Sequence, residues 1–125
     1  MTCSRFLQLP ERGALSVFFT AGYPRLGDTL PILKALQASG VDMAEVGFPF
    51  SDPVADGPTI QESSLVALRN GMTVATLFEQ VQAMRAEGVT MPVLLMGYLN
   101  PLERFGAEKF FSCLTRQSDS FDGAI

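Results

Sequence analysis

Short apolar runs alternate with amphipathic segments along this chain. Strand-like runs are expected at residues 14–19, 42–46, 93–96 and 123–125. The first, third and fourth are almost continuously hydrophobic, which is typical of strands buried on both faces of a parallel sheet. Apolar residues recur at helical spacing in the segments between these runs. They predict helices at residues 28–39, 58–70, 73–87 and 107–116.

Helix boundaries are marked by capping residues and by proline and glycine. Asp28 and Thr73 are typical N-cap side chains, and Pro58 suits the first turn of a helix. Gly88 follows the predicted end of the third helix. Residues 1–12 are expected to form a short helix or a loosely held arm. Strands that alternate with helices indicate right-handed β-α-β units and a parallel sheet.

Composition narrows the chemistry that the chain can perform. Its 125 residues are 47% hydrophobic, which fits one domain with an apolar core. The absence of histidine excludes Ser-His-Asp and Cys-His catalysis and every His-ligated metal site. Acid–base chemistry therefore falls to carboxylates, Tyr or Lys. A net charge of −4 disfavours a nucleic-acid-binding surface, because such surfaces are usually basic.

The sequence also predicts the cellular location of the chain. No apolar run approaches the roughly 20 residues of a membrane span, and the N-terminus lacks a signal-peptide core. Cys3 and Cys113 are far apart in sequence, which favours free thiols in a reducing compartment. We therefore expect a soluble cytoplasmic protein that binds neither membrane nor nucleic acid.

Two carboxylates stand out in and after the second predicted strand. Glu45 interrupts that strand near its carboxyl end, where barrel enzymes place catalytic groups. The alternatives are a solvent-facing Glu or one paired with Lys or Arg. Asp56 lies in the Pro- and Gly-rich loop that follows, either as the N-cap of the next helix or as a group that reaches over the barrel mouth. Two carboxylates in unlike environments can divide acid and base roles.

The segment containing both carboxylates resembles the signature of the tryptophan synthase alpha chain family. Residues 45–61 read EVGFPFSDPVADGPTIQ, a long and ungapped match that is rich in unusual residues. Residues 19–24 resemble the family's turn after the first strand, and residues 93–101 resemble its third strand and following loop. Residues 122–125 are similar to the start of its fourth strand. The resemblance covers essentially residues 14–125.

The resemblance implies a (β/α)8 TIM barrel that cleaves indole-3-glycerol phosphate to indole and glyceraldehyde 3-phosphate. By motif position, Glu45 corresponds to the family's general acid–base, and Asp56 to the carboxylate that accepts the indole N–H. Phe18 and Tyr98 match positions that line the indole pocket, with ordinary barrel packing as the alternative for both. The resemblance also implies an α2β2 complex with a beta chain, and pyridoxal phosphate would belong to that partner rather than to this chain. Residues 103–105, expected in a loop after the third strand, are candidates for contact with the beta chain.

The length of the chain limits this expectation. A complete (β/α)8 barrel needs about 250 residues, and its phosphate site is built after strands seven and eight. We therefore expect residues 1–125 to form the N-terminal half of a single barrel domain, with weak activity or none on its own.

Three interpretations of this half-length are open. The chain is a piece of an alpha chain, or a half-barrel binding module that pairs with a second half, or part of a stand-alone indole-glycerol-phosphate lyase. The strand that ends at Ile125 favours the first, because nothing in the sequence covers its edge.

Overall fold

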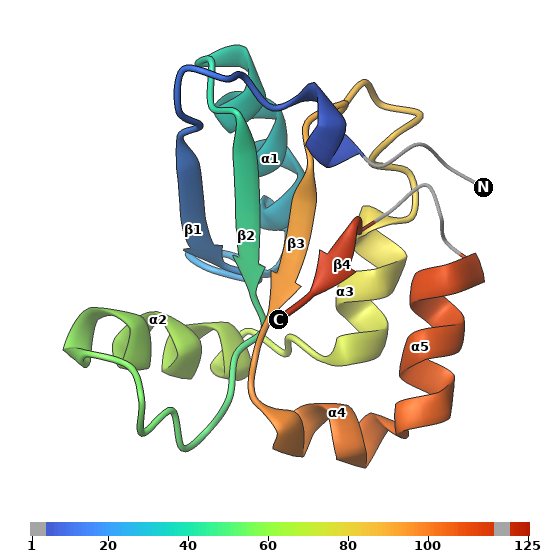
Figure 1. Ribbon diagram of the computed structural model, residues 1–125. Helices are drawn as coiled ribbons and strands as arrows, with labels where there is room; N and C mark the ends of the chain where they lie inside the picture. The colour runs from blue at the N-terminus through green and yellow to red at the C-terminus, as the bar shows by residue number, and fades with distance from the viewer. Residues whose placement is uncertain (1–4, 117–120) are drawn as a thin grey trace.

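A four-stranded parallel sheet in the order β1-β2-β3-β4 forms the centre of the molecule (Figure 1). The computed structural model describes residues 5–116 and 121–125. The strands are β1 (Ser16–Thr20), β2 (Met43–Gly47), β3 (Val93–Met96) and β4 (Gly123–Ala124). All four predicted strands are present, with bounds that differ by at most two residues, and the parallel pairing confirms the expected fold class.

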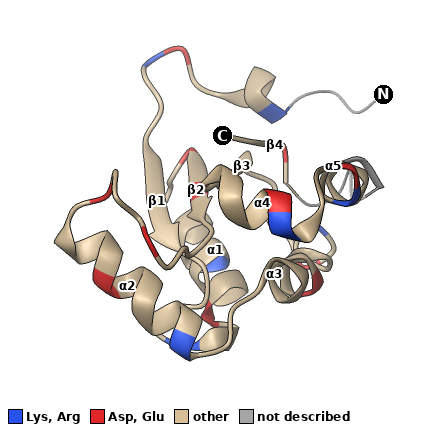
Figure 2. Cartoon of the chain, turned by 90° about the horizontal axis from the view of Figure 1, so that it is seen from below, with Lys and Arg blue, Asp and Glu red and all other residues tan. Residues whose placement is uncertain are grey.

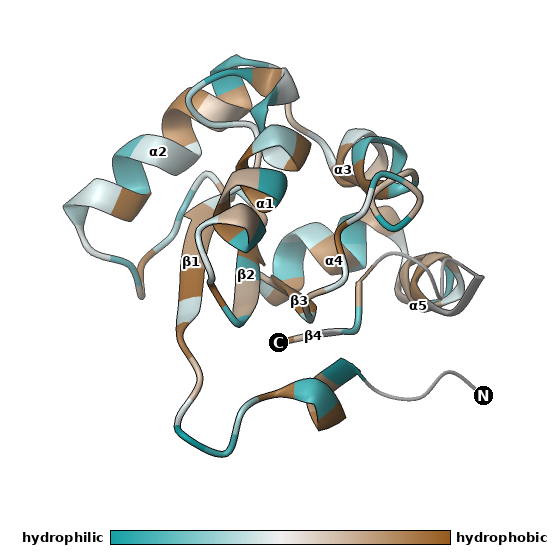
Figure 3. Ribbon diagram, turned by 90° about the horizontal axis from the view of Figure 1, so that it is seen from above, coloured by the Kyte–Doolittle hydropathy of each residue, from teal (hydrophilic) through white to brown (hydrophobic). Residues whose placement is uncertain are grey.

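The helices lie behind the sheet and at the carboxyl ends of its strands (Figure 1). The α-helices are α1 (Thr29–Ala38), α2 (Pro58–Arg69), α3 (Val74–Val81), α4 (Leu99–Phe105) and α5 (Ala107–Arg116). Two short 3-10 helices, η1 (Arg5–Gln8) and η2 (Leu26–Asp28), precede α1. Viewed along the strands, η1 and α1 lie on opposite sides of the sheet (Figure 3). No helix in the described part of the chain is long and apolar enough to cross a membrane.

The two faces of the sheet differ in burial. Ala44, Val46 and Leu95 point toward the helices and are buried in the core. On the opposite face, Phe18 pairs in register with Glu45, which in turn pairs with Leu94, and all three are only half-buried. In a closed barrel this second face is the interior. Phe18, Glu45 and Leu94 are therefore open to water here.

An aromatic cluster attaches the last two helices to the core. The ring of Phe78 on α3 lies 5.7 Å from Phe110, 6.0 Å from Phe121 and 6.1 Å from Phe105, centroid to centroid. Phe110 and Phe121 are almost fully buried. Aromatic pairs at these separations add about 0.5–1.5 kcal/mol each beyond the area that they bury.

A buried carboxylate holds the amino ends of β3 and β4 together. Asp122 accepts hydrogen bonds from Arg5 at 2.8 Å, from Arg85 at 2.6 Å and from the backbone N–H of Val93 at 2.8 Å. Its side chain is only 6% exposed. The Arg5 contact also fastens η1 to the sheet, so that residues 5–8 form a short helix rather than a loose arm.

The predicted helix at residues 73–87 is too long. Thr73 caps α3 as expected, because its side chain accepts a hydrogen bond from the N–H of Thr76, but the helix ends at Val81. The N–H of Met84 then bonds to the carbonyl of Val81 in a tighter turn. Met84 and Val89 are both buried in the core beyond the end of the helix.

Residues 99–105 form the helix α4, although the family resemblance implies a loop after the third strand. Pro101 lies in the first turn, where its missing N–H leaves no hydrogen bond unmade. Gly106 ends the helix at a φ of 100°, in the region that favours glycine. The candidate contact residues 103–105 therefore lie on a helix, and the expectation of a loop there is wrong.

The cysteines are described only in part. Cys113 on α5 is a free, half-buried thiol, as expected. Cys3 lies outside the described residues.

Candidate functional site

A cavity of about 250 Å³ opens at the carboxyl ends of β1, β2 and β3. Three of the four residues predicted for the site, Phe18, Asp56 and Tyr98, line it. Thr20 at the end of β1 and Met96 at the end of β3 contribute to its wall. The chain thus brings residues from three strands and from the β2–α2 loop (residues 48–57) to one place.

The β2–α2 loop is held at both of its ends. At the start, the N–H of Phe48 bonds to the carbonyl of Met96 at 2.7 Å. Beyond its end, the hydroxyls of Thr20 and of Ser63, in the middle of α2, form a buried hydrogen bond of 2.7 Å, which attaches α2 to β1. Viewed onto the carboxyl ends of the strands, this loop carries acidic positions and no basic ones (Figure 2).

Glycine is needed at the end of β2. A Cβ atom added to Gly47 would lie 2.3 Å from Cζ of Phe18 and 2.6 Å from Cε2 of the same ring. These distances are far inside van der Waals contact, so any side chain at position 47 displaces the ring. Gly47 therefore allows Phe18 to cover the end of the neighbouring strand and to form a wall of the cavity.

Asp56 is not the N-cap of α2. That position belongs to Gly57, and α2 has no side-chain cap. Instead, Oδ2 of Asp56 accepts a hydrogen bond from the hydroxyl of Tyr98 at 3.3 Å. The Asp56 carbonyl accepts a hydrogen bond from the side-chain amide of Gln61 at 2.8 Å. The structure thus favours the alternative in which the Asp56 carboxylate reaches over the strand ends.

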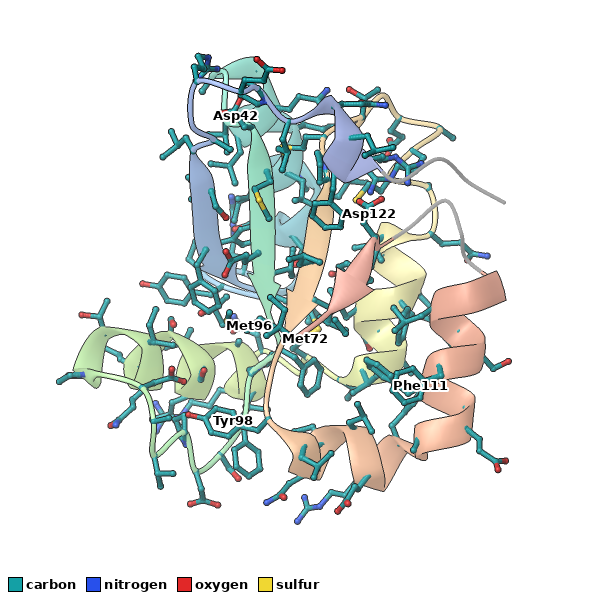
Figure 4. The ribbon with its side chains drawn as sticks, viewed as in Figure 1. Asp42, Met72, Met96, Tyr98, Phe111 and Asp122 are labelled. Atoms are coloured by element: carbon teal, nitrogen blue, oxygen red, sulfur yellow. The ribbon has the colours of Figure 1, made fainter. Side chains whose placement is uncertain are left out.

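Tyr98 lies between the end of β3 and the β2–α2 loop (Figure 4). Its hydroxyl accepts a hydrogen bond from the N–H of Ala55 at 3.0 Å while donating to Asp56. Its ring lies 5.2 Å from that of Phe50, centroid to centroid. Tyr98 therefore contacts both the first and the last part of the loop.

Glu45 points away from this cavity. Its Oε1 accepts a hydrogen bond of 2.8 Å from the hydroxyl of Ser16. Ser16 pairs with Met43, two residues closer to the amino end of the sheet than the pair of Phe18 and Glu45. The carboxylate of Glu45 is thus drawn toward the amino end, whereas Asp56 lies at the carboxyl end.

The structure supports neither of the two alternatives for Glu45. Its half-buried position does not fit a fully solvent-facing side chain. The ion pairs of the described residues include no partner for it, so pairing with Lys or Arg is not supported. Ser16 was not a predicted site residue. Its only signal in the sequence is a polar residue two positions before Phe18, on the same face of a strand.

A second cavity adjoins the first. It has a volume of about 300 Å³ and shares Phe48, Gly97 and Tyr98 with the lining of the cavity beside Asp56. Its walls are apolar side chains of α4 and α5, including Leu102 and Phe110, with Ile125 at the end of β4. Within the described part of the chain, no group of three or more His, Cys, Asp or Glu side chains is placed to hold a metal ion.

These features define a class of protein. A parallel sheet with its helices on one face and a loop-lined cavity at the carboxyl ends of its strands is the arrangement of (β/α)8 barrels. The four strands supply half of such a barrel.

The family model for the tryptophan synthase alpha chain matches residues 6–121. The chain is 54% identical over 122 residues to the tryptophan synthase alpha chain of Parabacteroides distasonis, covering 98% of this chain and 46% of that relative. It is 58% identical over 100 residues to the tryptophan synthase of Saccharomyces cerevisiae, covering 80% of this chain and 14% of the yeast protein. The chain belongs to the tryptophan synthase alpha chain family.

Solved structures agree with this assignment. The tryptophan synthase subunit alpha of Legionella pneumophila superposes with a TM-score of 0.89 at 33% identity, covering 98% of this chain and 48% of that one. The aminoacrylate-bound tryptophan synthase of Mycobacterium tuberculosis gives a TM-score of 0.79 at 34% identity, covering 91% and 46%. The chain therefore spans about half the length of the alpha chains that it matches.

Proposed function

We propose that this chain carries the acid–base groups of a tryptophan synthase alpha chain, the lyase that cleaves indole-3-glycerol phosphate into indole and glyceraldehyde 3-phosphate. The observation that carries the proposal is the position of Asp56. The family signature folds into a loop that brings this carboxylate to the strand ends, into one cavity with Phe18 and Tyr98.

The reaction requires two proton transfers. Breaking the bond between the indole ring and its side chain needs a proton at the ring carbon. It also needs a proton to leave the adjacent side-chain hydroxyl, whose carbon departs as the aldehyde. We assign both transfers to Glu45. Protonation of the ring carbon leaves positive charge on the ring nitrogen, and Asp56 stabilises that charge by accepting the N–H.

Glu45 has to move for this chemistry. In the structure its carboxylate is bonded to Ser16, toward the amino end of the sheet. We propose that it leaves Ser16 and turns toward the cavity when substrate is bound. Phe18 and Tyr98 then contact the indole ring, as the resemblance implies.

The proposed partner is a tryptophan synthase beta chain, in an α2β2 complex that works in the cytoplasm. Family membership supports this proposal, and a matching M. tuberculosis structure is itself described as tryptophan synthase. Pyridoxal phosphate is assigned to the beta chain, because the proposed cleavage needs only proton transfers from this chain.

A chimera tests the proposed activity. Residues 1–125 replace the corresponding segment of the P. distasonis alpha chain, which completes the barrel around the site. We expect the chimera to release indole from indole-3-glycerol phosphate. Glu45→Gln and Asp56→Asn should each lower the rate about 100-fold or more, the usual effect of removing an acid–base or charge-stabilising group.

The matched control is Glu62→Gln, which neutralises an exposed carboxylate on α2 and should leave the rate unchanged. A chimera that unfolds cooperatively but releases no indole would refute the proposed function. So would full activity in both the Glu45 and the Asp56 variants.

A further inference from the structure

The hydroxyl of Tyr98 has two partners on consecutive residues of the β2–α2 loop. It accepts a hydrogen bond from the N–H of Ala55 at 3.0 Å and donates to Oδ2 of Asp56 at 3.3 Å. A phenol carries a single proton, and a backbone N–H cannot accept it. The contact with Ala55 therefore directs the proton of Tyr98 toward the Asp56 carboxylate.

The ring of Tyr98 is itself held in place. It packs on Phe50 with centroids 5.2 Å apart and planes inclined by 32°. Its backbone is the N-cap of α4, so its position depends on a helix rather than on the loop. The β2–α2 loop is consequently oriented by a residue from another element, which contacts it at Phe50 and again at Ala55 and Asp56.

The bond leaves part of Asp56 available. Only Oδ2 is bonded to Tyr98, and a carboxylate has two oxygens with about four lone-pair sites in all. Asp56 and Tyr98 both line the cavity of about 250 Å³. A donor on a bound ring can therefore reach a carboxylate whose orientation is already set.

We infer that Tyr98 is a positioning residue, whose hydroxyl orients the carboxylate of Asp56 to accept the N–H of an indole ring. The inference deepens the proposed function and rests on it. It differs from a role for Tyr98 as a pocket wall, because a wall needs only the ring, whereas positioning needs the hydroxyl.

Tyr98→Phe separates these two roles, because it removes the hydroxyl and keeps the ring that packs on Phe50. The ligands are indole and 1-methylindole, which lacks the N–H. The chain contains no Trp, so the fluorescence of the ligand reports binding without a tryptophan background. We expect the wild-type chain to prefer indole. Tyr98→Phe should reduce that preference roughly threefold to tenfold, the effect of losing one hydrogen bond, and should leave 1-methylindole binding unchanged.

Two further variants serve as a positive and a negative control for Tyr98→Phe. Asp56→Asn should also reduce the preference for indole. Tyr23→Phe is the matched control, since Tyr23 is the only other tyrosine and is 40% exposed outside the cavity. Tyr98→Phe with an unaltered preference, or with equal losses for both ligands, would overturn the positioning role while leaving the proposed function standing.

Hydrogen exchange gives a readout that does not depend on indole. The amide of Ala55 should exchange faster in Tyr98→Phe, whereas the amide of Thr76, which Thr73 caps, should not change. If the wild-type chain does not distinguish the two ligands, the proposed contact between Asp56 and indole fails. An unchanged Ala55 exchange rate would then overturn the role of Tyr98 separately.

Discussion

Gly47 shows how one residue sets the shape of the candidate site. The ring of Phe18 occupies the space that a Cβ atom at position 47 would fill. The consequence is a cavity wall formed by a side chain of β1 across the end of β2. The contact joins two elements that are separate in sequence, so Gly47 matters through Phe18 rather than through its own backbone freedom.

We predict that Gly47→Ala pushes the ring of Phe18 out of its place. Displaced side chains in packed cores typically cost about 1–3 kcal/mol, and we expect a loss of unfolding free energy at the lower end of this range, because Phe18 is half-buried and its clashing atoms are the far end of the ring. Urea unfolding measures this loss, and the aromatic NMR signals of Phe18 report the displacement. Gly27→Ala is the control, because a Cβ there meets nothing within 4 Å. Equal stability of the two variants would show that the ring is not confined.

At the scale of elements, buried polar contacts hold the strands and helices in place. The clearest is Asp122, which bonds to η1 through Arg5, to the turn after α3 through Arg85, and to β3 through Val93. A helix cap has the same kind of effect on a smaller scale, and Thr73 provides one at the start of α3. These contacts hold β4 and α3 in place against the strands that carry the site.

Replacing Asp122 by Asn should loosen three elements at once. Removing one charge from a buried ion pair typically costs about 3–5 kcal/mol, because the partner charge stays buried. Glu87→Gln is the control, since Glu87 and its partner Lys34 are 44% and 46% exposed and such pairs contribute about 0–1 kcal/mol. Denaturant unfolding of both variants compares them. Similar small losses would contradict the role given to Asp122.

Thr73→Ala should remove the N-cap of α3 and lower the unfolding free energy by about 1 kcal/mol. The exposed Thr59, in the first turn of α2, is the matched threonine for comparison, and its replacement by Ala should have little effect. Thermal unfolding followed by circular dichroism distinguishes the two. Identical midpoints would mean that the cap contributes nothing.

The sequence predicted the elements better than it predicted their ends. The strands and the Thr73 cap follow from local patterns, apolar runs and a side chain that accepts from the next turn. The end of α3 could not be predicted in this way, because the apolar spacing continues to Met84 although the helix ends at Val81. The helix α4 was missed because residues 93–101 were interpreted, from the family resemblance, as a strand followed by a loop; its Pro101 lies in the first turn, where proline is tolerated.

At the candidate functional site too, the sequence predicted residues but not their tertiary contacts. The family signature located Asp56, and the structure places it in one cavity with Phe18 and Tyr98. The contact between Glu45 and Ser16 could not be predicted, because it depends on which rotamer Glu45 adopts and on the pairing of β1 with β2.

The whole molecule is a sheet that is covered on one side. The helices bury Ala44, Val46 and Leu95 on one face, while the other carries Phe18, Glu45 and Leu94 in half-buried positions. Water therefore has access to the residues that would surround a substrate. An open site weakens charge stabilisation, because electrostatic effects are smaller in water than in a dry interior.

Leu94 and Leu95, adjacent residues of β3 on opposite faces of the sheet, test whether one face is open to water. Leu95→Lys should abolish folding, because Leu95 is 4% exposed in the core. Leu94→Lys should be tolerated and should keep the chain monomeric at higher concentration, since a charge on an open apolar face opposes association. Circular dichroism and sedimentation velocity measure both effects. Unfolding by both substitutions alike would contradict an open face.

The open face of the sheet should also limit the catalytic activity of the chain on its own. For the 125-residue chain alone, we predict indole release no faster than that of its Glu45→Gln, Asp56→Asn double variant. A rate clearly above this control would mean that the open face closes in solution, for example by pairing with a second copy.

The central claim is that Glu45 and Asp56 act as one catalytic unit, although the structure holds them toward opposite ends of the sheet. A double-mutant cycle on indole release by the P. distasonis chimera tests it most directly. We predict strong non-additivity, with the double variant close to the slower single variant, because residues that act together lose their effect together. Losses that simply multiply would contradict a shared role for the two carboxylates.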